Sequence, residues 1–239
     1  TGATLKTNGT TFTTNSNALT LSGGILEVSG TQNLGGVVPD NSTTLRLAAN
    51  SKIIADNASL SVGTLDLANF ALTLDDNMSR LSIGQPVTLD AATEQIISGA
   101  ADLSLNGGIS VTAGTLSSTG GTLSLPGGAT LANGLLDSTG GDWVLGGDFL
   151  KSSGTLTISE TDLKLEGNIT LTSDEDEKLS FVNLNLNDFT LTLGSSTSDL
   201  TVENAITIDA STEGILTGGA DLLLDALTLS AGDVTSTGG

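Results

Sequence analysis

Two stretches of the chain decide its fold. Leu65–Leu105 reads LDLANFALTLDDNMSRLSIGQPVTLDAATEQIISGAADLSL, and Leu184–Leu224 reads LNLNDFTLTLGSSTSDLTVENAITIDASTEGILTGGADLLL. They align without a gap at an offset of 119 residues, and 19 of the 41 aligned positions are identical. Self-similarity at a fixed long period is the signature of a repeat architecture. The sequence therefore predicts two copies of one unit, residues 1–118 and 119–239, the second continuous with the first.

Within each copy the apolar residues alternate with polar ones, as in Phe189–Leu193 (FTLTL) and Ile206–Ala210 (ITIDA). A period of two places Leu, Ile and Val on one face of a strand and Thr, Ser and Asp on the other. No stretch keeps the apolar spacing of an amphipathic helix for three turns. The pattern predicts an all-β protein.

These short strands recur about every seven residues, with Gly, Asn, Asp or Ser between them. That spacing fits one strand and one tight corner of a three-sided coil of about 20 residues, so a unit of 119 residues is expected to hold close to six coils. We predict a parallel β-helix (β-solenoid), right-handed because crossovers between parallel strands almost always are. The alternative is two tandem β-sandwich domains, which would show hairpin contacts and a break near Gly120.

The composition excludes several classes of function. The chain has no Cys and no His, so disulfides, the usual zinc sites and the usual nucleophile–base pairs are excluded. Seven basic residues against 27 acidic ones exclude the basic stripe that nucleic-acid binding requires. No apolar run is long enough to cross a membrane, so we expect no membrane insertion of this segment. We predict that the protein is not an enzyme.

The densest anionic spot is Asp174, Glu175, Asp176 and Glu177. Ca²⁺ prefers several carboxylate and carbonyl oxygens that converge in one loop, so these four residues are the candidate metal ligands. Their counterpart in the first copy, Ala55–Ala58, lacks the charges, and a run of charges on a loop is usually only solvated. Apart from this possible Ca²⁺ we predict no cofactor.

Two recurring acidic features and one aromatic residue have local explanations. Asp90–Glu94 (DAATE) recurs as Asp209–Glu213 (DASTE), and Asp102 recurs as Asp221. We expect the Asp and Thr side chains to cap corners by bonding backbone N–H groups. The single Trp143 is expected to cover part of the core; the alternative is a ligand-stacking residue.

The repeated phrases in Gly121–Leu125 and Phe189–Gly194, with the absence of Cys, resemble the repetitive β-solenoid shafts of large bacterial adhesins, such as filamentous haemagglutinin-like and autotransporter passenger proteins. The resemblance covers the whole chain and lies in composition and architecture. It implies a right-handed parallel β-helix, export across the envelope, an extracellular or cell-surface location, and a spacer or adhesive role. A unit of 119 residues is longer than the repeats typical of such shafts.

The functional expectation is a non-catalytic structural spacer or adhesin segment of a long repetitive fibrous protein. Its expected partners are adjacent repeats or copies of itself, stacked head to tail because neither end carries a capping element, and a surface glycan or protein receptor is a further candidate. The alternative is a carbohydrate- or calcium-binding surface module.

Overall fold

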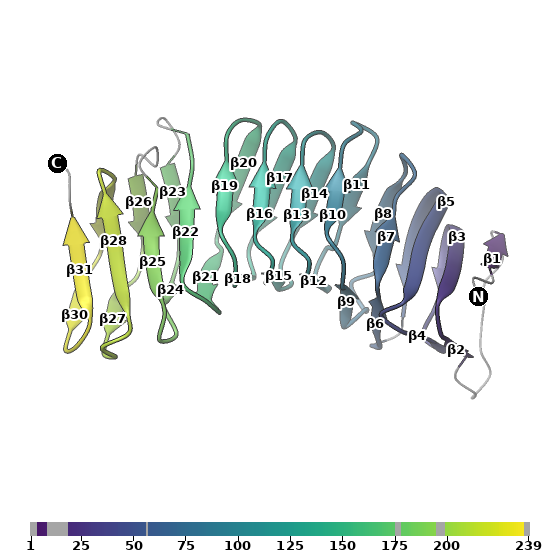
Figure 1. Cartoon of the computed structure of the whole chain (residues 1–239), viewed down its shortest axis with the longest axis horizontal. Coiled ribbons are helices and arrows are strands. Elements are labelled where there is room, and N and C mark those ends of the chain that lie inside the picture. The colour runs from purple at the N-terminus through teal and green to yellow at the C-terminus, as the bar shows by residue number, and fades with distance from the viewer. Residues whose placement is uncertain (1–3, 9–18, 56, 175–177, 195–198, 237–239) are drawn as a thin grey trace.

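The computed structural model describes residues 4–8, 19–55, 57–174, 178–194 and 199–236, and these residues form a parallel β-solenoid (Figure 1). Every strand pair among the described residues is parallel, and partners lie 18–24 residues apart. Coils of about 21 residues make about ten turns with three main parallel sheets. The prediction of a three-sided solenoid is confirmed.

Three faces run along the rod, and the chain visits them in the order I, II, III. Face I contains β8 (Ala71–Leu74), β11 (Gln95–Ile97), β14 (Thr115–Ser118), β17 (Leu135–Thr139) and β20 (Thr155–Ser159), followed by β23 (Lys178–Phe181), β26 (Asp199–Val202) and β29 (Asp221–Leu224). Face II contains β6 (Ser59–Val62), β9 (Arg80–Ile83), β12 (Asp102–Leu105), β15 (Leu123–Leu125), β18 (Asp142–Leu145), β21 (Asp162–Leu165) and β24 (Leu184–Asn185), followed by β27 (Ile206–Ile208) and β30 (Leu227–Leu229). Face III contains β10 (Val87–Leu89), β13 (Ile109–Val111), β16 (Ala129–Leu131), β19 (Phe149–Lys151), β22 (Ile169–Thr172), β25 (Thr190–Leu193), β28 (Gly214–Gly218) and β31 (Asp233–Ser236).

Two strands of the N-terminal coils, β3 (Gly24–Asn33) and β5 (Thr43–Ile54), are long and turn a corner without breaking. The short strands there are β1 (Thr4–Asn8), β2 (Leu19–Leu21), β4 (Val37–Pro39) and β7 (Thr64–Asp66). The first half of β5 pairs with β7 and its second half pairs with β8, so one strand serves two faces. The register between β3 and β5 shifts after Val28, where the corner lies.

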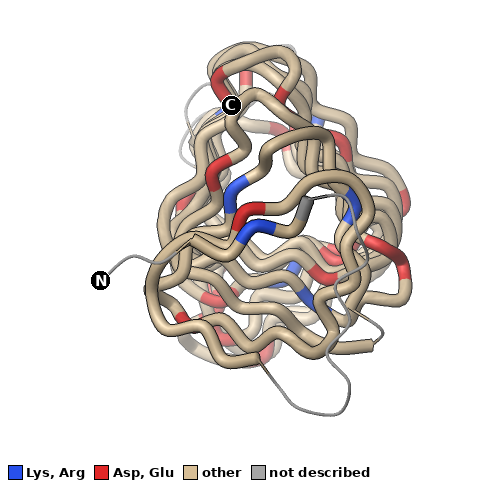
Figure 2. Tube along the Cα trace, turned by 90° about the vertical axis from the view of Figure 1, so that its right-hand side faces the viewer, with Lys and Arg blue, Asp and Glu red and all other residues tan. Residues whose placement is uncertain are grey.

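The core is a stack of mostly aliphatic layers. The backbone of the three faces surrounds it (Figure 2). In most strands the inward residues are buried and the outward ones are partly or fully exposed, as in β25 and β26. Trp143 is fully buried, with its ring centroid 5.5 Å from that of Phe149 and 6.1 Å from that of Phe181. The prediction that Trp143 belongs to the core is confirmed.

The solenoid continues through the boundary between the two copies. Leu103 pairs with Leu123 on face II, and Leu116 pairs with Leu136 on face I. Both pairs join residues on opposite sides of the boundary at residue 118. Because the strands stack in parallel on both sides of the boundary, the tandem β-sandwich alternative is wrong.

The expectation of close to six coils in each unit is confirmed, but the unit does not contain a whole number of coils. The ladder that contains Leu72 in the first copy runs through Ile96 to Leu116 and Leu136 on face I. Its sequence equivalent, Leu191, lies on face III. From β8 to β25 the chain makes 17 strands, which is five and two-thirds coils. The second copy is therefore turned by one face about the axis of the rod.

Candidate functional surfaces

The acidic run proposed as a metal site begins beside a buried lysine. Asp174 Oδ2 lies 2.6 Å from Lys151 Nζ, and the Lys151 side chain is only 3% exposed. Glu175, Asp176 and Glu177 lie outside the described residues. No group of three or more acidic residues with metal-site geometry occurs in the described part of the chain. Asp174 balances the charge of Lys151, and the calcium hypothesis stays untested at the other three residues.

Lys151 is buried because inward and outward side chains alternate along β19, as they do along the neighbouring strands. It lies in register with Leu131 of the preceding coil, on the inward side of β19. A buried ammonium group is costly unless it is paired. The sequence phrase FLK at 149–151 places Phe149 and Lys151 on the same side of the strand, and this signal could have identified the inward lysine.

The recurring DAATE and DASTE corners are held by their glutamates. Glu94 is 7% exposed and accepts hydrogen bonds from the amides of Asp90 (2.8 Å), Ala91 (3.3 Å) and, one coil earlier, Asn69 (3.3 Å). The prediction of a corner capped through side-chain bonds to backbone N–H groups is confirmed. At this corner the capping residue is Glu94 and not the predicted Asp or Thr, whereas Asp102 does accept a backbone amide, that of Thr122.

The second copy repeats this arrangement. Glu213 is buried and accepts hydrogen bonds from the amides of Asp209 (2.9 Å), Ala210 (3.3 Å) and Asp188 (3.3 Å). Burial of the Glu213 carboxyl group favours a higher pKa, but these three hydrogen bonds outweigh it and the pKa is lowered. Each glutamate therefore fastens its own corner to the turn one coil earlier.

The corner reached by each glutamate is a left-handed turn. Ala68 and Asn69 have φ of 50° and 70°, and Asn187 and Asp188 have the same two values. On the opposite side of the glutamate corner lies Gly114, with φ of 74°, where a Cβ would meet the carbonyl oxygens of Ala91 and Glu94. This stack of three corners is a structural device, and it occurs twice on different faces.

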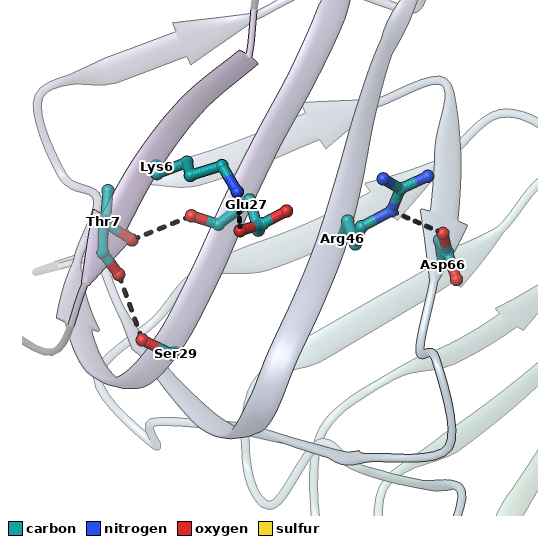
Figure 3. Close-up of polar contacts among 6 residues, drawn as sticks. All are labelled: Lys6, Thr7, Glu27, Ser29, Arg46 and Asp66. Atoms are coloured by element: carbon teal, nitrogen blue, oxygen red, sulfur yellow. Dashed lines mark hydrogen bonds and ion pairs between the residues drawn. The ribbon is translucent and has the colours of Figure 1, made fainter.

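Most of the basic residues join adjacent coils. Lys6 Nζ lies 3.0 Å from Glu27, and Arg46 Nε lies 2.7 Å from Asp66 (Figure 3). Near the first of these pairs, the Thr7 hydroxyl donates to the Glu27 carbonyl and the Ser29 hydroxyl donates to the Thr7 carbonyl. Further pairs join Lys52 to Asp75, Arg80 to Asp102, and Lys178 to Asp199. These basic groups neutralise acidic neighbours one coil away.

The boundary between the copies carries its own hydrogen bond. Asp102 Oδ1 accepts the amide of Thr122 at 2.9 Å, across the step from β12 to β15. Asp221 is the sequence equivalent of Asp102, and it lies on β29, the last strand of face I. Asp221 pairs with Asp199 through the β26–β29 ladder, and its exposed side chain makes no hydrogen bond or ion pair with another described residue.

The C-terminal coil exposes residues that its predecessors bury. Leu227 and Leu229 are 41% and 52% exposed, although Ile206 and Ile208, their partners one coil earlier, are fully buried.

No family model, curated protein or solved structure matches the chain. The described part of the chain contains no long apolar helix of the kind that crosses a bilayer.

Proposed function

We propose that this chain is a non-catalytic spacer, a rigid segment of a long repetitive bacterial protein that is secreted or held at the cell surface, as in adhesin shafts. The observation that carries the proposal is the uninterrupted stack of parallel coils through both copies. In such a stack each coil buries its apolar layer only against its neighbours, so length is gained by adding coils.

The side chains support this proposal. Glu94, Glu213, Lys151 and most other basic residues are occupied in fastening one coil to the next. Six ion pairs and both glutamate corners join adjacent coils along the rod, which favours stiffness over recognition of a small ligand. The proposed partners are further coils of the same kind, from adjacent repeats or from other copies.

Length is the property that tests a spacer. Joining the sequence end to end with a second copy of itself should lengthen the rod by about 55 Å, from about 4.8 Å for each added coil. Small-angle X-ray scattering of the single and joined chains measures this difference. A joined chain that folds back on itself, with little gain in maximum dimension, would contradict the proposal.

Binding experiments separate the spacer from the alternative function. We expect no saturable signal when the chain is titrated with Ca²⁺ in a calorimeter or applied to a glycan array. Stoichiometric binding of either ligand would favour a carbohydrate- or calcium-binding module instead.

A further inference from the structure

The sheet of face I is interrupted in the middle of the rod. In the described chain β20 pairs with β17 and with no later strand, and β23 pairs with β26 and with no earlier one. These two strands lie one coil apart. At the same step β21 pairs with β24 on face II, and β22 pairs with β25 on face III. The stack of coils therefore continues here through two of its three faces.

The next step along the rod is interrupted on a different face. Among the described strands β24 and β27 of face II do not pair, whereas β23 pairs with β26 and β25 pairs with β28. Face III alone is one sheet through both steps, and its strands β22, β25, β28 and β31 lie side by side (Figure 1). By contrast, all three faces pair at the step from β17, β18 and β19 to β20, β21 and β22.

The interruption on face I leaves backbone groups of β20 outside any ladder. The amide of Thr155 donates to the Gly134 carbonyl of the preceding coil. Because alternate residues of a strand direct their N–H and C=O groups to opposite edges, those of Leu156 and Ile158 point toward β23. Since β20 and β23 do not pair, face I can separate at this step without breaking a ladder between these two strands.

The side chains beneath this interruption are less covered than their equivalents. Leu116, Leu136 and Leu156 form one column of inward residues on face I. Leu116 and Leu136 are fully buried, whereas Leu156 is only partly buried. The core is therefore less well covered at β20 than at the two strands before it.

An aromatic cluster fills the core at the same place. Trp143 on β18 and Phe149 on β19 precede the interruption, and Phe181 on β23 follows it. The Trp143 ring centroid lies 5.5 Å from that of Phe149 and 6.1 Å from that of Phe181. Contact between rings is apolar and requires no backbone register. The cluster therefore joins the two sides of the step where the ladder on face I does not.

The closed arrangement leaves one buried donor unsatisfied. Trp143 Nε1 has no hydrogen-bond partner in the described chain, although the side chain is fully buried. A buried donor without an acceptor destabilises the state that buries it, and water can satisfy the same donor when the core opens.

We propose that the coil of β23, β24 and β25, with the steps on its two sides, is a joint in the rod. The rod bends there by separating face I at the first step and face II at the second, while the continuous sheet of face III is the hinge. Both separations bend the rod in the same direction, toward face III. The proposal goes beyond the spacer function, because it gives an otherwise stiff rod one point of bending.

The reason that bending concentrates at this coil is the nearest-neighbour character of a solenoid. Its stability is a sum of terms for single coils and for the interfaces between adjacent coils. A bending force therefore opens the weakest interfaces first. The two steps that pair on two faces open before the steps that pair on three.

Distances between pairs of nitroxide labels test the position of the joint, and the absence of native cysteine allows labelling at single engineered cysteines. Ser117→Cys with Thr201→Cys spans the joint on face I. Thr73→Cys with Thr157→Cys spans the same number of coils before the joint on the same face. In a straight rod both pairs of backbone positions lie about 19 Å apart, four coils of 4.8 Å.

The pair across the joint should give the wider distribution. We expect it to be at least about twofold wider for Ser117/Thr201 than for Thr73/Thr157, and shifted to longer distances. Thr130→Cys with Leu216→Cys spans the joint on face III and should show no shift to longer distances. Equal widths of the two face I pairs would overturn the joint. Lengthening on face III equal to that on face I would overturn the hinge.

Trp143, the single tryptophan, reports on the joint without labels. Phe181→Leu weakens the contact across the interruption, so acrylamide should quench Trp143 fluorescence at least about threefold faster than in the unaltered chain. Phe149→Leu is the matched control, because Phe149 also contacts Trp143 but lies on the same side of the interruption. Equal quenching in the two variants would overturn the role of the cluster in closing the joint. A rod that is uniformly stiff by both measurements would overturn the proposal and leave the spacer function intact.

Discussion

Replacing Glu94 by alanine tests how much the glutamate corners stabilise the rod. The carboxylate accepts three backbone amides, one at 2.8 Å and two at 3.3 Å, and joins two consecutive coils. Hydrogen bonds to a charged group contribute about 1.5–3 kcal/mol each when they are short and buried. Two of the three are long and all three donors lie near the surface, so we expect a total loss of about 3 kcal/mol.

The Glu94→Gln variant measures how much of this loss remains when one acceptor oxygen is kept and the charge is removed. Glu94→Gln keeps one acceptor oxygen but presents an amide donor to the N–H groups, so we expect about half the loss, roughly 1.5 kcal/mol. Thr93→Ala, an exposed neighbour in the same corner, is the matched control and should change stability by less than about 0.5 kcal/mol. The identical geometry at Glu213 predicts a comparable loss for Glu213→Ala.

Urea unfolding followed by circular dichroism measures these differences, and amide hydrogen exchange localises them. Exchange at Asn69, Asp90 and Ala91 should accelerate in Glu94→Ala, because each amide loses its acceptor. If Glu94→Ala is no less stable than Thr93→Ala, and the three amides exchange as before, the reasoning about the corner is refuted.

Three further predictions follow from single sites. Lys151→Met should leave stability unchanged or raise it by about 1–4 kcal/mol, whereas Asp174→Ala should cost about 1–3 kcal/mol, because it removes an ion pair of a buried ammonium group; urea unfolding compares them. The folded-state pKa of Glu213 lies below its usual 4.5, so its carboxylate contributes fully above pH 4.5 and its contribution disappears as the pH falls through the folded value; acid titration of Glu213→Gln should lack this component. Gly114→Ala should destabilise by at least about 1–3 kcal/mol, because φ is positive and a Cβ would meet the carbonyl oxygens of Ala91 and Glu94, whereas Gly219→Ala, with open space around it, serves as the control in thermal melts.

Much of the fold could be predicted because the strands and corners of the solenoid are determined by residues that are close together in the sequence. Alternation such as FTLTL defines strand and inward face, and Gly, Asn and Asp mark corners, so three-sided coils follow from residues close in sequence. The burial of Trp143 followed from the same alternation. The rotation of the second copy was also present in the sequence. Seven residues per side and 119 per unit give 17 sides, which three-sided coils do not divide evenly.

The partners within the core and corners could not be predicted as well. Glu94 and Glu213 look like any exposed corner acids until the preceding coil places a left-handed turn beside them. Lys151 forms an ion pair with Asp174, which lies 23 residues later in the sequence, at the start of the run proposed as a calcium site. Such contacts depend on which residues meet across one coil. The coil length varies from 18 to 24 residues, so the sequence alone does not reveal these pairs.

The pattern of inter-strand contacts in solution tests the central claim, a continuous solenoid whose second copy is turned by one face. Backbone nuclear Overhauser effects of the assigned chain measure it. The ladder that contains Leu193, on the same strand as Leu191, should lead back through Leu171, Phe149 and Ile109 to Val87, with contacts 20–22 residues apart on both sides of the copy boundary. Hairpin contacts with a break near Gly120, or a ladder that connects Leu191 to Leu72, would contradict it.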